Sequence, residues 1–367
     1  MQTRFFKRAL ALLLAFACLL AGGTAAFAQP PAEARSAVLT YLAAAVPTPV
    51  VSSVGGEWAV LALARGDATV ASGYYDGYVS RVKQTLQDNG GVLPGSANRK
   101  TEYSRVVIAL SALGEDVTSL GGYNLLLPLA NFSDVTAQGI NGPIYALIAF
   151  STRGWEIPAI ADAAKQTTRQ KLIDYILARE IPSGGFAMAG TSAAADITAM
   201  ALQALAPYQA DAAVEAATGR ALTTLSNMQL PDGGFGYDTE GETAESAAQV
   251  ITALAALGLN PTTDTRFVKS GGNPMTALLA LQQADGSFFH IAAGTGSKQM
   301  ATEQAAYALV AYGRFLSGKT ALYDMSDVTP KEEPPPPTPP QWWESPPLPA
   351  WLHLVLRYLL FGWIWMR

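Results

Sequence analysis

Cysteine, histidine and charged residues are all scarce in this chain of 367 residues. The one cysteine, Cys18, lies in an N-terminal apolar stretch, so the rest of the chain can form neither a disulfide nor a thiolate metal site. The two histidines, His290 and His353, lie on either side of a proline-rich segment, which argues against a metal site built from several histidines. With 14% charged residues and a net charge of −5, the chain has no basic excess to hold phosphates. We therefore expect no metal site, no evident cofactor and no nucleic-acid partner.

Hydrophobic residues, in contrast, make up 50% of the chain, and the first group of them follows a short basic start. The apolar run extends from Ala9 to Leu20, and Ala26-Phe27-Ala28 has the small-x-small pattern of a cleavage site before Gln29. This pattern predicts a signal peptide over residues 1–28 and export to the cell surface or the extracellular side of the membrane. Two alternatives stay open: a retained membrane helix, and a lipoprotein attached through Cys18.

The body of the chain has helical apolar spacing throughout, and one phrase recurs along it. Ala109-Leu-Ser-Ala-Leu-Gly114 and Ala253-Leu-Ala-Ala-Leu-Gly258 are nearly the same phrase. Variants begin at Leu61, Ala146, Ala201 and Ala308. The copies lie roughly 37 to 55 residues apart, which is enough for two helices and a turn. Small alanines would let inner helices pack closely, with Leu and Tyr between two layers. The sequence thus predicts an all-α fold, an α/α toroid of about six helical pairs, over residues 29–328.

Glycine turns precede several copies of the phrase, and two of these turns share a fuller signature. Both read Gln-x-x-Asp-Gly-x-Phe, and their defining residues are Gln229, Asp232, Phe235, Gln282, Asp285 and Phe288. The Asp-Gly pair supplies a turn with positive φ and a carboxylate that accepts backbone N–H groups. We expect the aromatic residue to fill the gap between adjacent helical pairs and the glutamine to bond to a neighbouring helix end. We therefore interpret these motifs as structural.

The composition changes abruptly after Asp327. Residues 329–349 are rich in proline and predict a stiff, extended linker. Residues 350–367 are apolar and aromatic, and they are short for a membrane span. Arg357 near their middle would be costly in a bilayer, so a helix lying in the interface is an alternative to a spanning anchor. A tail that docks on a protein is the third interpretation.

The repeats resemble the prenyltransferase and squalene-oxidase repeat of α/α-toroid proteins, with phenylalanine where the turns of triterpene cyclases carry tryptophan. The closer resemblance is to secreted bacterial proteins of the terpene cyclase/mutase family, strongest from about residue 180 to 328. It is carried by Glu245–Gly258, Met300–Tyr312 and Leu322–Asp327. A more distant resemblance, through Asp196–Leu202, is to the helical domain of the cobalamin carriers transcobalamin and intrinsic factor. These resemblances imply a toroid and either polyprenyl chemistry or cobalamin binding.

The residue clusters that such chemistry needs are missing from the sequence. Cyclases of this kind protonate their substrate from an Asp-x-Asp-Asp cluster, and this chain has none. Prenyl transfer in this fold uses zinc held by Asp, Cys and His, yet the predicted mature body has one histidine and no cysteine. The small β-rich domain that closes over cobalamin in the carriers is replaced here by the linker and the apolar tail. These absences favour a protein without catalytic activity, although an enzyme remains an alternative.

Several polar residues are nevertheless placed to meet at one mouth of the predicted ring. Asp196 and Glu303 each lie five residues before the Ala-Leu of their repeat. The candidate ligand-binding residues are Glu102, Asp196, Gln203, Glu245, Gln249, Glu303 and Tyr307. The alternative interpretation of the carboxylates is that they are helix caps or first-turn acids favoured by the helix dipole.

We therefore predict an exported, membrane-tethered binding protein that holds a small molecule or a surface protein. The alternatives are a cyclase-like or prenyltransferase-like enzyme with an unfamiliar acid, a carrier similar to the cobalamin-binding domain, and a structural or adhesion module.

Overall fold

The computed structural model describes residues 29–52, 54–237, 241–296 and 298–331. The predicted signal peptide, the apolar C-terminal segment and nearly all of the proline-rich linker lie outside the described residues. The chain divides into a compact unit, Met1–Pro330, and a second unit, Lys331–Arg367.

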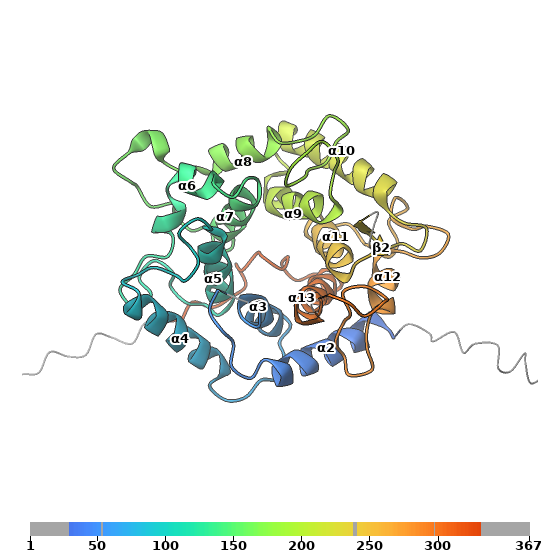
Figure 1. Cartoon of the computed structure of the whole chain (residues 1–367), viewed down its shortest axis with the longest axis horizontal. Coiled ribbons are helices and arrows are strands. Elements are labelled where there is room, and N and C mark those ends of the chain that lie inside the picture. Colours follow the sequence, from blue (N-terminus) through green and yellow to red (C-terminus); the bar gives the residue numbers. More distant parts are fainter. Residues whose placement is uncertain (1–28, 53, 238–240, 297, 332–367) are drawn as a thin grey trace, which may run out of the picture. The chain divides into compact units, whose positions relative to one another are not determined.

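Helices of the first unit alternate between an inner and an outer ring (Figure 1). The inner helices are α3 (Glu57–Arg65), α5 (Thr101–Ala112), α7 (Asn141–Ser151), α9 (Ala195–Leu205), α11 (Ala244–Ala256) and α13 (Lys298–Leu316). The outer helices are α2 (Pro31–Ala45), α4 (Tyr74–Asp88), α6 (Phe132–Thr136), α8 (Arg169–Leu177), α10 (Ala212–Met228) and α12 (Pro274–Ala280). Each inner helix contacts the next, and α13 contacts α3, which closes the ring. The predicted all-α toroid is confirmed.

Short elements connect these helices. Three 3-10 turns, η1, η2 and η3, cover Leu127–Leu129, Ala163–Lys165 and Ala206–Tyr208. An antiparallel pair, β1 (Gly236–Tyr237) and β2 (Gly241–Glu242), precedes α11 with Gly236 opposite Glu242.

The two rings differ in how their helices are buried, and this difference follows from composition. Every residue of α9 except Asp196 is buried, and apolar residues occur on every side of the helix. A helix that is apolar all round must be surrounded by protein. The outer helix α4 instead buries one stripe, which runs from Tyr74 through Tyr78 and Val82 to Leu86. Full burial of each such side chain contributes about 1.5–3 kcal/mol, so the layer between the rings is the main source of stability.

The glycine turns join each outer helix to the next inner helix. At the end of one turn, the backbone N–H of Phe288 donates to Thr302 Oγ1 at 2.9 Å, and Phe186 and Thr198 repeat this bond at 2.9 Å. The signature glutamines reach further, because Gln282 Nε2 donates to the Ala34 carbonyl on α2 at 3.1 Å. That bond links the last repeat to the first helix of the ring.

The two signature carboxylates and aromatic rings have matching environments. Asp232 Oδ1 accepts from the Gly234 N–H at 2.9 Å, and Asp285 Oδ1 accepts from the Ser287 N–H at 3.0 Å. Phe235 is fully buried, as is Phe288. Each turn therefore combines a local hydrogen bond with an aromatic side chain in the core.

Among the described residues, none of the helices combines the length and the apolar character that crossing a membrane requires.

Candidate functional site

The inner helices run in the same direction, so the ring has an N-terminal mouth and a C-terminal mouth. At the starts of α3 and α13, the Gly55 N–H donates to Glu303 Oε1 at 2.7 Å. At the ends of the same two helices, Arg65 and Arg314 bind a common carboxylate, that of Asp327. The predicted carboxylates lie near the first mouth.

Each predicted carboxylate near the N-terminal mouth already binds a group of its own chain. Glu102 forms an ion pair with Arg105, and Glu245 Oε2 lies 2.6 Å from His290 Nδ1. Asp196 Oδ1 accepts from the Ile197 N–H at 2.8 Å. Glu102, Asp196 and Glu245 are first-turn residues of α5, α9 and α11, where the helix dipole favours a negative charge.

Sequence reasoning missed Glu57, which is buried at the start of α3. Its Oε1 accepts from the Ser52 N–H at 2.7 Å and from the Tyr78 hydroxyl at 3.2 Å. Glu57 lies five residues before Ala62-Leu63, the same spacing that singled out Asp196 and Glu303. The spacing rule applied to the first copy of the repeat would have found it.

Burial raises the pKa of Glu303 above its ordinary value, although hydrogen bonds from Gln299 and Gly55 and the charge of Arg105 oppose the rise. Burial raises the pKa of Glu57 in the same way. One oxygen of each, Oε2, accepts no hydrogen bond within the described residues. Both groups are thus buried acids that resist ionisation.

Replacing Glu303 by glutamine is expected to stabilise the protein at about pH 8 and to change little at about pH 4. The pKa of Glu303 in the folded state exceeds its pKa in the unfolded state. The contribution of Glu303 to the free energy of unfolding is therefore complete below the unfolded-state pKa, and it is lost as the pH rises through the folded-state pKa. Glutamine keeps an acceptor for the Gly55 N–H and cannot ionise. Urea unfolding at the two pH values measures the difference, with Glu215→Gln on the exposed face of α10 as the control. An unchanged pH slope in Glu303→Gln would contradict this account.

Polar and aromatic side chains fill the space enclosed by the inner helices. Gln203 Nε2 on α9 donates to the backbone carbonyl and to Oε1 of Gln249 on α11, at 3.0 and 2.8 Å. Gln249 Nε2 in turn donates to the Tyr307 hydroxyl on α13 at 2.6 Å. The ring of Trp58 lies 5.8 Å from those of Tyr145 and Tyr307, measured between centroids. The predicted residues Gln203, Gln249 and Tyr307 are thus brought together as one network that joins three inner helices.

A segment after α13, residues 320–328, crosses the centre of the ring at the C-terminal mouth; we call it the strap (Figure 1). Arg65 Nη1 lies 2.7 Å from Asp327 Oδ1, and Arg314 Nη2 lies 2.5 Å from Asp327 Oδ2. On the far side, the Met325 N–H donates to the Thr152 carbonyl at the end of α7 at 2.8 Å. The strap is therefore attached to α3 and α13 through Asp327 and to the end of α7 through Met325.

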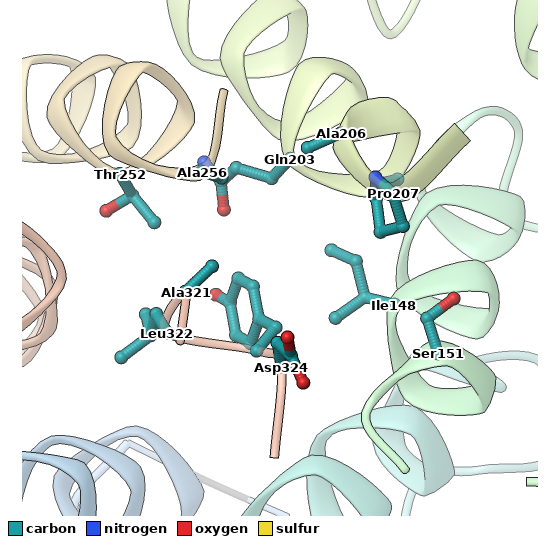
Figure 2. A pocket seen from close by; sticks show the side chains of 12 residues that line it. Ile148, Ser151, Gln203, Ala206, Pro207, Thr252, Ala256, Ala321, Leu322 and Asp324 are labelled. Atoms are coloured by element: carbon teal, nitrogen blue, oxygen red, sulfur yellow. The ribbon is translucent and has the colours of Figure 1, made fainter. Parts of the chain in front are cut away.

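Under the strap lies a cavity of about 350 Å³, the strap cavity (Figure 2). It is lined by the C-terminal parts of α7, α9 and α11 and by the strap itself. Its wall includes Ile148, Ser151, Gln203, Ala256, Tyr323 and Asp324. Of the seven residues predicted to bind ligand, Gln203 lines this cavity. No signal within the repeats points to the cavity, because the strap that covers it lies outside them.

Within the described residues, no group of histidine, cysteine, aspartate and glutamate side chains could hold a metal ion.

The family model of the prenyltransferase alpha-alpha toroid domain matches residues 144–269, from α7 to the segment that follows α11. This stretch is therefore similar to that toroid domain, and the α/α-toroid fold described above agrees with the match. No curated protein matches the chain. The matched residues include most of α7 and all of α9 and α11, and these three inner helices line the strap cavity.

Proposed function

We propose that the chain is an exported, non-catalytic binding protein whose toroid holds a small molecule in the strap cavity. The observation that carries the proposal is the cavity itself. Its volume of about 350 Å³ lies within the usual range for small-molecule sites, about 300–1,000 Å³. The rest of the ring interior offers no comparable support, because Trp58, Tyr145, Tyr307 and the glutamine network occupy it.

Export and tethering are the parts of this proposal that rest on sequence alone. The basic start, the apolar run and the cleavage pattern support removal of residues 1–28. The aromatic, apolar residues 350–367 support attachment to a membrane through a proline-rich spacer. Both segments lie outside the described residues. Together they would place the ring at the cell surface, where a binding protein meets its ligand.

Native mass spectrometry of the protein purified from its own host tests the binding function. We expect a chain that begins at Gln29 and carries one small molecule. Phenylalanine at Ala256, which lines the cavity at the end of α11 and is only partly buried, should fill the space and release that molecule. Ala44→Phe on the exposed face of α2 is the matched control. A wild-type protein without ligand, or a ligand that Ala256→Phe retains, would contradict the proposed function.

An enzyme acting on a polyprenyl substrate is the second candidate, and one observation favours it. Aromatic side chains that could stabilise a cation, Trp58 and Tyr307, belong to the same inner ring as the buried acid Glu303. Incubation with a linear polyprene, followed by mass analysis of the products, separates the two candidates. Turnover that Glu303→Gln abolishes would replace the binding function by this one.

A further inference from the structure

The polar groups that face the strap cavity include a hydrogen-bond acceptor that none of the described residues uses. Gln203 is only 4% exposed, and its Nε2 donates hydrogen bonds to both oxygens of Gln249, the backbone carbonyl and Oε1. The remaining polar atom, Oε1, accepts no hydrogen bond from the described residues, and Figure 2 shows it directed into the cavity. An amide oxygen accepts hydrogen bonds, so a ligand in the cavity can donate to it.

A carboxylate on the strap supplies a second acceptor. Asp324 lines the cavity, and its Oδ1 accepts from the Ser326 N–H at 3.1 Å (Figure 2). The nearby guanidinium of Arg65 donates to the Asp327 carboxylate, to Thr320 and to carbonyls of the strap, including the backbone carbonyl of Asp324 at 2.7 Å. None of the described residues that line the cavity is a lysine, an arginine or a histidine. The strap therefore places a negative charge at the cavity without a basic side chain in its wall.

The helices around the cavity add to the negative potential. Lining residues lie at or just beyond the ends of α7, α9 and α11, among them Ser151, Ala206 and Ala256. The C-terminus of a helix carries the equivalent of roughly −0.5 elementary charge from its unpaired carbonyls. Three such ends around one cavity favour a cation over an anion or a neutral molecule.

The remainder of the wall is apolar and limits the size of the ligand. Ile148, Ala204, Pro207 and Leu322 contribute hydrocarbon, and Tyr323 contributes an aromatic side chain. Burial raises the pKa of Tyr323 well above its ordinary value, so its hydroxyl stays neutral at physiological pH. The wall thus suits a ligand with a small hydrocarbon or aromatic body. The positively charged group of such a ligand would lie on the side of the cavity where Asp324 is.

We propose that the strap cavity binds a small primary amine, with the ammonium group donating to Asp324 and Gln203 and the apolar body lying against Ile148 and Leu322. This inference rests on the proposed binding function and names the chemical class of its ligand. An ammonium group has three donors and no acceptor, which matches a site that offers acceptors.

Three probes of similar shape and different charge test this assignment by titration calorimetry on the full-length protein. They are 2-phenylethylamine, 2-phenylethanol and phenylacetate. The amine is expected to bind at least tenfold more tightly than the alcohol, and phenylacetate is expected to be the weakest. Asp324→Asn should weaken binding of the amine about tenfold, since a charge-assisted hydrogen bond becomes a neutral one. Asp88→Asn, at the exposed end of α4, should leave it unchanged.

Several outcomes would overturn the amine assignment. They are equal binding of amine and alcohol, preferred binding of phenylacetate, no binding of any probe, and an Asp324→Asn variant that binds the amine like the wild type. Failure of the amine assignment alone can be distinguished from failure of the binding function. If native mass spectrometry finds a retained molecule that is not an amine and that Ala256→Phe releases, the cavity binds a ligand and only the ligand class was wrong.

Discussion

Alanine at Phe288 is expected to lower the free energy of unfolding by about 3–5 kcal/mol, the usual loss for a large aromatic side chain in a core. Phe288 is fully buried at the end of the last signature turn, and its backbone N–H binds Thr302 on α13. The same turn touches the first helix, because a Cβ at Gly286 would lie 2.6 Å from the Ala37 carbonyl oxygen. Phe288 therefore packs where the ring closes, and urea unfolding followed by circular dichroism measures its contribution.

The adjacent phenylalanine provides the matched control. Phe289 is only partly buried, so Phe289→Ala removes the same atoms from the neighbouring position while leaving a smaller void. We expect a loss of about 1–2 kcal/mol, because the destabilisation grows with the cavity left behind. Equal losses in the two variants would show that the ring of Phe288 is not specifically packed and would contradict a structural role for the signature.

Alanine at Asp327 is expected to cost about 2–4 kcal/mol and to loosen the strap. The variant leaves Arg65 and Arg314, whose side chains are 4% and 5% exposed, without their shared carboxylate. Removing one partner of a fully buried pair typically costs about 3–5 kcal/mol, and the lower range applies here because Asp327 is 35% exposed. Urea unfolding gives the energy, and limited proteolysis should show cleavage within residues 320–328 of the variant.

The pH dependence of the wild type should reflect the same ion pairs. Partial burial opposes ionisation of Asp327, but hydrogen bonds from Arg65 and Arg314 outweigh it and hold the pKa of Asp327 at about 2. Since this pKa is depressed, the stabilisation is present above the unfolded value of 3.8 and is lost as the pH falls through about 2.

An exposed ion pair serves as the comparison for Asp327. Lys319 and Asp67 approach to 2.9 Å with side chains 51% and 73% exposed, so Asp67→Ala should cost less than about 1 kcal/mol. A loss in Asp327→Ala no larger than that in Asp67→Ala, together with an intact strap under proteolysis, would show that Arg65 and Arg314 do not hold the strap.

The sequence by itself determined the toroid. The Ala-Leu phrases and the Gln-x-x-Asp-Gly-x-Phe turns recur at a spacing of one helical pair, and such a pair cannot bury its apolar face alone. Local patterns of this kind are visible because each turn and each helix is contained within a few consecutive residues. They also located Glu102, Asp196, Glu245 and Glu303 near the starts of inner helices.

Only the tertiary structure decided what these residues contact and where an open space remains. The carboxylates bind partners such as Arg105, His290 and the Gly55 N–H, none of which is marked by the repeat. The strap lies across the opposite mouth because Asp327 meets Arg65, which is 262 residues away in the sequence. Contacts over that separation depend on closure of the whole ring. For this reason the strap and its cavity are products of the three-dimensional arrangement, whereas the helices that frame them follow from the local pattern.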